Sequence, residues 1–231
     1  MYTTAPGTPD AYLYTPAFAH AIWPLAQLPW PLFVLLITVG IGATLAWLLK
    51  PLGWKWGLPL WLAGLPEVVS GNIFILMAVV AVVGFSTPGS WAFVGLTKIT
   101  PCVGPIWFLV RGEWKNLVLA IASIGVIAGI SFTISPSLWE EWLNFIVGHS
   151  GASTQPIGSP FLPPPALRIP VGIALVVWGA LRNKPWSIPV AMFLCTPVLW
   201  LGSFTLLAAI PRLKAGRKSS DPDALLLDEK R

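Results

Sequence analysis

Two ionisable side chains interrupt a long uncharged stretch of the sequence. Glu67 and Lys98 are the only charged residues in the stretch from Trp56 to Val110, and each lies close to a proline. An ionisable group at membrane depth costs at least about 2.5–3.5 kcal/mol, so it usually faces a cavity or a partner. We expect the two to line a polar cavity that binds an anionic headgroup. The alternatives are a structural Glu67–Lys98 ion pair and snorkelling to an interface.

Four further side chains could take part in chemistry at the same face. Tyr12 and Tyr14 precede the first long apolar run, and His149 lies in a loop where it could donate to a phosphate. Asp10 is the only acid before Glu67, which makes it the one early carboxylate available as a base. The alternatives are interfacial aromatic anchors for the tyrosines, an ordinary exposed loop for His149, and a solvated carboxylate for Asp10.

Familiar soluble enzymes and metal proteins are excluded by what the sequence lacks. It has no nucleophile elbow, phosphate-binding loop, zincin helix or dinucleotide fingerprint. Its two cysteines, Cys102 and Cys195, lie in apolar stretches outside any Cys/His cluster, so we expect free buried thiols and no metal or cofactor. The net charge of +5 comes without a nucleic-acid-binding motif, so nucleic acid is not an expected partner.

The composition is that of an integral membrane protein. Hydrophobic types make up 55% of the 231 residues and charged types 10%, against roughly 25% charged in soluble domains. Mean hydropathy is +0.75. So little charge cannot cover a fold with polar surface, and lipid must cover it instead. The fourteen tryptophans agree, because tryptophan is enriched at membrane–water interfaces.

The apolar runs predict an all-α, polytopic bundle of transmembrane helices, several of them short and broken. Polar or proline-containing breaks divide two of the runs, at 64–72, which includes Asn72, and at 98–101. Such irregular backbone is tolerated at membrane depth only where it faces protein or a water-filled cavity. We predict clear spans at 31–49, 116–134 and 167–181, an amphipathic interfacial helix at 137–147, and bent hairpins within 57–110 and 186–211.

The basic residues set the expected topology and domain limits. They form clusters at 50–55, 111–115 and 182–184 and after residue 211, whereas segments 1–30 and 135–166 hold no Lys or Arg. By the positive-inside rule the clusters face the cytoplasm and these two segments face outside. We therefore expect one transmembrane domain over 1–211 and a disordered cytoplasmic tail over 212–231, in a multi-pass protein of the bacterial inner membrane type.

An ordered series of short motifs resembles glycosyltransferase family 87. The resemblance covers roughly residues 11–147 and rests on the order and spacing of these segments: Tyr12-Leu-Tyr-Thr-Pro-Ala-Phe18, Pro24-Leu25, Leu28-Pro29, Gly71-Asn72, Leu96-Thr-Lys-Ile-Thr-Pro101 and Arg111-Gly-Glu-Trp-Lys115. It implies a fold like that of the GT-C superfamily of polytopic glycosyltransferases. These enzymes use polyprenyl-phosphate sugars, typically mannose, as donors.

The resemblance implies an inverting hexose transfer on the outer face. A carboxylate base would deprotonate an acceptor hydroxyl, and basic groups would stabilise the leaving lipid phosphate. Lys98 is our candidate for the latter role, with Glu67, Asn72, Tyr12, Tyr14 and His149 as further substrate-binding candidates.

The sequence departs from the family pattern before residue 12. Family members carry a further span and an outer loop with the catalytic Asp there, so we expect an N-terminally truncated form that is inactive alone. A protein partner would then supply the missing elements. Two other functions stay open: a transporter or lipid-flipping protein, and a non-catalytic membrane subunit.

Overall fold

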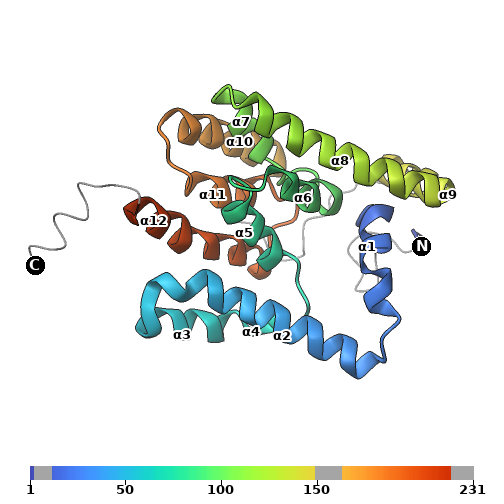
Figure 1. Cartoon of the computed structure of the whole chain (residues 1–231), viewed down its shortest axis with the longest axis horizontal. Helices are drawn as coiled ribbons and strands as arrows, with labels where there is room; N and C mark the ends of the chain where they lie inside the picture. Colours follow the sequence, from blue (N-terminus) through green and yellow to red (C-terminus); the bar gives the residue numbers. More distant parts are fainter. Residues whose placement is uncertain (3–11, 149–162, 220–231) are drawn as a thin grey trace, which may run out of the picture.

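The computed structural model describes residues 1–2, 12–148 and 163–219, and all the regular elements in these ranges are helices. Figure 1 shows their arrangement. In chain order they are α1 (Pro16–Ala26), α2 (Trp30–Leu49), η1 (Lys50–Leu52), α3 (Gly53–Ala63), α4 (Leu65–Val69), α5 (Phe74–Val83), η2 (Pro88–Ser90), α6 (Trp91–Thr97), α7 (Gly104–Val110), α8 (Trp114–Ile134), α9 (Pro136–Gly148), α10 (Pro165–Leu181), α11 (Ser187–Cys195), η3 (Leu201–Ala209) and α12 (Ile210–Ser219). The all-α prediction is confirmed for the part of the chain that the structure describes.

Helix α8 has the length and surface of a membrane-spanning helix. Its 21 residues rise about 30 Å, which matches the thickness of a hydrocarbon core. Only 11% of its most apolar window is buried, and Ile121, Val126 and Ile130 are more than half exposed. A core helix of a soluble protein would bury these side chains. Such an exposed apolar face indicates contact with lipid.

The second candidate span is a helical run from Trp30 to Ala63 that folds back on itself. The chain turns at η1, where Gly53 has a φ of +68°, a conformation that favours glycine. Helix α3 then returns along α2, and the indole of Trp61 donates to the carbonyl of Gly42 at 2.8 Å. Helix α2 therefore covers the apolar run at 31–49 that we predicted as a span.

The remaining helices are too short to count as candidate spans. Two of them, α5 and α10, are apolar throughout most of their length but have 10 and 17 residues. Two helices could therefore cross a membrane by length and composition. The larger number of crossings that we predicted from the sequence stays a prediction.

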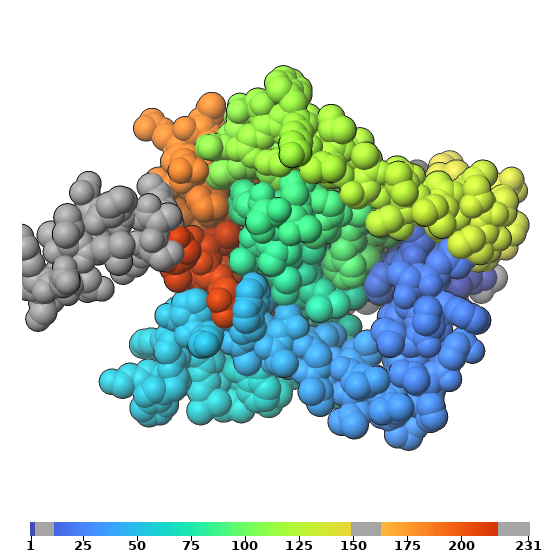
Figure 2. Space-filling view, in the orientation of Figure 1, coloured from blue at the N-terminus to red at the C-terminus, as the bar shows by residue number. Residues whose placement is uncertain are grey.

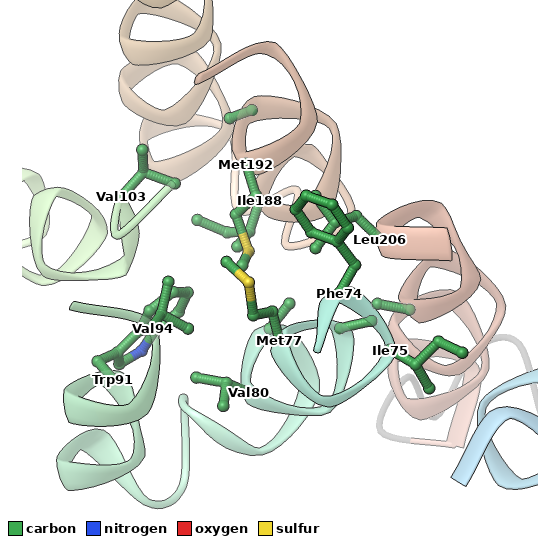
Figure 3. Close-up of a cluster of buried hydrophobic side chains, with 14 of the residues drawn as sticks. Phe74, Ile75, Met77, Val80, Trp91, Val94, Val103, Ile188, Met192 and Leu206 are labelled. Atoms are coloured by element: carbon green, nitrogen blue, oxygen red, sulfur yellow. The ribbon is translucent and has the colours of Figure 1, made fainter. Parts of the chain in front are cut away.

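The core lies between the two long helices. Helices α2 and α8 run along opposite edges of the molecule, and the short helices fill the centre (Figure 1). In the space-filling view, the surface near residues 75–97 occupies the space between the α2–α3 hairpin and α8 (Figure 2). Figure 3 shows Phe74 and Met77 of α5 meeting Ile188 and Met192 of α11 and Leu206 of η3, and all five are at most 1% exposed.

The basic clusters meet at one end of the molecule. Arg111, after α7, donates to the carbonyl of Ala180 at 3.2 Å near the end of α10. Arg212 of α12 donates to the carbonyl of Trp47 at 2.6 Å, close to the α2–α3 turn. We call this region, where α7, α10 and the α2–α3 hairpin end around α12, the basic end.

The opposite end holds α1 and α9, which come from the two segments that lack Lys and Arg. Ser131 of α8 joins α1 and α9 there, because its hydroxyl lies 2.9 Å from His20 Nδ1 and accepts from the indole of Trp139 at 3.1 Å. The amino group of Met1 pairs with Glu141 at 3.5 Å. The structure thus separates a basic end from an end formed by α1 and α9.

The first residues of the predicted disordered tail form a helix instead. Helix α12 continues to Ser219, so residues 212–219 are helical, and residues 220–231 lie outside the described ranges. The helix is held by Arg212, whose guanidinium lies 4.0 Å from the centre of the Trp47 ring. Composition alone misses this, because the contact partner lies in a distant part of the sequence.

Candidate functional site

The first helix break holds two of the predicted site residues in direct contact. Glu67 of α4 accepts a hydrogen bond from the side-chain amide of Asn72. The Asn72 oxygen in turn accepts the backbone N–H of Phe74 at 3.1 Å and so satisfies a free donor at the start of α5. Gly71, with a φ of +68°, allows the turn between them. The pair orders the break between α4 and α5.

A second break, before η3, packs onto the same two side chains. A Cβ atom at Gly202 would overlap the Glu67 carboxylate and would meet the Asn72 nitrogen at 2.7 Å. Only glycine therefore lets the start of η3 approach this pair. This contact brings together two breaks that are more than a hundred residues apart in sequence, at 70–73 and 196–200.

Lys98 lies at the third break and has no carboxylate partner in the described part of the chain. It ends α6, and its ammonium group lies 4.2 Å from the centre of the Phe74 ring. A cation over an aromatic face is attracted by the ring electrons. The alternative of a Glu67–Lys98 ion pair is therefore wrong for this structure, since Glu67 bonds to Asn72 instead. Lys98 keeps its charge available beside the start of α5.

Arg168 is a functional candidate that the sequence analysis missed. Only 5% of it is exposed, and its guanidinium donates to four backbone carbonyls. Nε bonds to Pro163 at 2.7 Å, Nη1 to Leu194 at 3.1 Å and Thr196 at 2.8 Å, and Nη2 to Pro197 at 2.9 Å. It thus ties the start of α10 to the break before η3. The signal was present in the sequence, because Arg168 is the only ionisable residue within α10.

The tyrosine segment reaches the end of α6 that carries Lys98. The hydroxyl of Thr15, which is buried, donates to the carbonyl of Leu96, two residues before Lys98. Tyr12 and Tyr14 stack edge to face with ring centres 5.5 Å apart, and Tyr14 continues onto Phe18 at 5.0 Å.

The phenol of Tyr12 stays protonated at neutral pH. Burial, together with the neighbouring phenols of Tyr2 and Tyr14, raises the pKa of Tyr12 above its usual range. Its hydroxyl donates to the carbonyl of Thr15 at 3.3 Å. A role for Tyr12 and Tyr14 in substrate binding stays a prediction.

These contacts form one connected cluster of helix breaks, which we call the break cluster: Glu67, Asn72, Phe74, Lys98, Arg168 and Gly202. It carries two cations and one carboxylate, and that carboxylate is already hydrogen-bonded. Arg168 is engaged by backbone carbonyls, so Lys98 is the group of this cluster that can attract an anion. Two of the predicted residues, Asp10 and His149, lie outside the described ranges, so their position relative to the cluster stays a prediction.

Neither of two cavities in the described part is lined by the predicted site residues. One, of about 590 Å³, is an apolar groove between α2 and α3 bounded by Trp47, Trp54 and Trp61. The other, of about 430 Å³, lies at the basic end. No group of three or more potential metal ligands occurs in the described ranges. Lys98 is half-buried beside the Phe74 ring, and the polar cavity that we expected around it stays a prediction.

Comparison with known proteins gives one match. The family model for glycosyltransferase family 87 matches residues 12–225, which is nearly the whole chain. No curated protein and no solved structure gives a significant match. The family match includes α10 to α12, beyond the 11–147 range on which the motif resemblance rested.

Proposed function

The chain belongs to glycosyltransferase family 87, and we propose that it takes a hexose, typically mannose, from a polyprenyl-phosphate carrier in the membrane. Family membership makes it a membrane protein of the glycosyltransferase type. The carrier lipid, the sugar and the side of transfer are our proposal. The observation that carries it is Lys98, a half-buried cation without a carboxylate partner in the described ranges, at a break between apolar helices.

A lipid phosphate is the ligand that this arrangement would attract. It is anionic, it lies in the membrane, and its ester oxygen becomes the leaving group when the sugar is transferred. The Lys98 ammonium can approach a phosphate from its position on the Phe74 ring, and a fixed cation stabilises the charge that develops on the leaving oxygen. Glu67 and Asn72 hold the break on which Phe74 lies, so they would position Lys98 rather than react.

The reaction that we propose is an inverting displacement. A carboxylate base removes the proton of the acceptor hydroxyl, the hydroxyl oxygen bonds to the anomeric carbon, and the bond from that carbon to the phosphate oxygen breaks. The electron pair of that bond leaves with the lipid phosphate. Asp10 is the candidate base in this chain, and Lys98 stabilises the departing anion.

We further propose a multi-pass topology with the sugar transferred outside. The basic end supports this topology, because it gathers Lys50, Arg111 and Arg212 near one end of the bundle. Positive charge concentrates on the cytoplasmic side of membrane proteins. Helices α1 and α9 would then face outside, together with the tyrosine segment that packs on the end of α6.

Donor binding by Lys98 variants tests the proposal. We expect Lys98→Met to weaken binding of a polyprenyl-phosphate hexose by about tenfold or more, since a charge-assisted contact is lost, and Lys98→Arg to retain most of it. Lys55→Met is the matched control, because Lys55 is exposed on the α2–α3 hairpin at the basic end. Unchanged binding in Lys98→Met, with only the melting temperature lowered, would make Lys98 a structural residue.

The discontinuous helices favour a second candidate, a transporter or flippase for the same kind of lipid. Three helix breaks meet in the break cluster: the one between α4 and α5, the one between α6 and α7, and the one between α11 and η3. Transporters build their substrate sites from discontinuous helices of this kind. Counterflow of labelled lipid-linked sugar across vesicles, without transfer to any acceptor, would support this candidate over an enzyme.

A further inference from the structure

The cavity at the basic end has the chemistry of an anion site. It has a volume of about 430 Å³ and lies where α5 and α7 end, between the α10–α11 turn and α12. Its polar lining consists mainly of Arg111, Glu113, Asn183 and Arg212, and the rings of Phe85 and Trp107 form part of its wall. None of these residues belongs to the break cluster, so the cavity is a separate site and does not depend on the proposed function.

Arg111 is fixed in place with donors to spare. Its Nε donates to Glu113 at 2.6 Å, and its Nη1 donates to the carbonyl of Ala180 at 3.2 Å and to the Asn183 side chain at 3.5 Å. Its Nη2 makes no hydrogen bond within the described residues. Because three contacts hold the guanidinium, a ligand that takes up the remaining donors needs to order little of the side chain.

Arg212 presents the second guanidinium. Its Nε donates to the carbonyl of Trp47 at 2.6 Å, and its guanidinium carbon lies 4.0 Å from the centre of the Trp47 ring. Stacking on a ring face leaves the edge of the guanidinium open. Both of its Nη groups lack a hydrogen-bond partner in the part of the chain that the structure describes. Two arginines from helices far apart in sequence thus line one cavity with unused donors.

The cavity keeps a positive charge. Its one acid, Glu113, is already engaged by Arg111 and by the side-chain amide of Asn116, which donates to it at 3.0 Å. The remaining positive charge of the lining comes from Arg212. Three further basic residues are close in sequence to the lining residues Asn183 and Arg212: Arg182, Lys184 and Lys214. An anionic ligand would therefore meet little repulsion.

Exposed tryptophans at the basic end are typical of the depth of lipid headgroups. Trp54, Trp56 and Trp114 lie at the helix ends that form the basic end, and they are 77%, 69% and 63% exposed. Tryptophan gathers at membrane–water interfaces because its ring is apolar and its N–H is polar. Lipid headgroup phosphates are the anions concentrated at that depth.

We propose that this cavity binds the phosphate of an anionic phospholipid headgroup from the leaflet at the basic end. The planar guanidinium of Arg212 can donate a pair of parallel hydrogen bonds from its two Nη groups to the oxygens of a phosphodiester, and Nη2 of Arg111 supplies a further donor. The neighbouring apolar groove shares Trp47 with this site, because Trp47 lines the groove and stacks under Arg212. An acyl chain of the same lipid could follow that groove.

Lipid binding to the purified full chain in detergent tests the proposal. We expect phosphatidylglycerol to bind at least about tenfold more tightly than phosphatidylcholine, and Arg212→Gln to remove about tenfold of that preference. Lys55→Gln, which removes one exposed charge at the same end but outside the cavity, should leave the preference within about twofold. Bound lipid can be counted by native mass spectrometry during titration.

Three results would overturn the proposal. The first is an equal loss in Arg212→Gln and Lys55→Gln, which would mean general attraction to a basic surface. The second is competition by glycerol phosphate or inorganic phosphate at concentrations close to those of the lipid, which would identify a soluble anion as the ligand. The third result concerns Arg212→Lys, which is used if Arg212→Gln fails to fold. This variant keeps the charge but loses the planar pair of donors, and a lipid preference equal to that of the unaltered protein would contradict the proposal.

Discussion

Replacing Arg168 by glutamine tests whether this buried cation holds the break cluster together. Arg168 is 5% exposed and donates to the carbonyls of Pro163, Leu194, Thr196 and Pro197. Glutamine has two side-chain N–H donors, so at least two of the four carbonyls lose their partner. Each buried carbonyl left without a donor costs about 1–3 kcal/mol. We therefore expect the free energy of unfolding to fall by about 2–6 kcal/mol.

The protein supplies its own reporter for this measurement. Cys195 is free and buried, and its thiol lies 3.8 Å from the carbonyl of Ile169 in α10, so we expect it to react only after α11 separates from α10. The other free cysteine, the half-buried Cys102, is replaced by serine in all variants so that Cys195 alone reports unfolding. Thermal unfolding can be followed with a thiol-reactive dye in detergent. At about 2–4 °C per kcal/mol for a protein of this size, the midpoint should fall by about 4 °C or more.

An exposed arginine at the other end of α10 provides a control for the loss of a positive charge. Arg182→Gln removes an exposed arginine just after α10 and should change the free energy of unfolding by less than about 0.5 kcal/mol. Arg168→Lys keeps the charge but not the fork of donors, and should behave much like Arg168→Gln. If Arg168→Gln melts within about 1 °C of the unaltered protein, or no lower than Arg182→Gln, the four hydrogen bonds do not hold this break.

Three further outcomes follow from particular contacts. Gly202→Ala should lower the free energy of unfolding by about 1–3 kcal/mol, because the added methyl group overlaps the Glu67 carboxylate, and an unshifted thermal midpoint would show that η3 can move away freely. Thr15→Val should cost about 1–2 kcal/mol and increase proteolysis of the first 25 residues, since the buried bond from the Thr15 hydroxyl is lost; unchanged cleavage would contradict this. Cysteines placed at Ser137 and Lys115 should react with an impermeant thiol reagent from opposite sides of the membrane, and labelling of both from one side would refute the proposed topology.

Local sequence signals were enough to locate the long helices and the breaks. The apolar runs at 31–49 and 116–134 became α2 and α8, and the amphipathic run at 137–147 became α9. Prolines and polar residues near 66–72 and 98–101 marked the ends of α4 and α6 correctly. These features depend on composition over a few turns, so neighbouring residues carry the information.

Contacts between distant segments were not predictable in the same way. The ion pair that we kept as an alternative for Glu67 and Lys98 does not form, because Glu67 accepts from Asn72, five residues away, and Lys98 lies over the Phe74 ring. The role of Arg168 depends on carbonyls nearly thirty residues later, and the helix at 212–219 depends on Trp47. Each of these partners is chosen by the packing of the whole chain.

Photo-crosslinking with a lipid-linked sugar tests the central claim most directly. A polyprenyl-phosphate hexose with a photoreactive group next to its phosphate should label the peptide around residues 96–104 of the membrane-embedded protein. Unlabelled polyprenyl phosphate should compete with this labelling, a nucleotide sugar should not, and Lys98→Met should reduce it by about tenfold. Labelling that a nucleotide sugar abolishes, or that falls elsewhere and is unchanged in Lys98→Met, would contradict the proposal that Lys98 receives the phosphate of a lipid-linked donor.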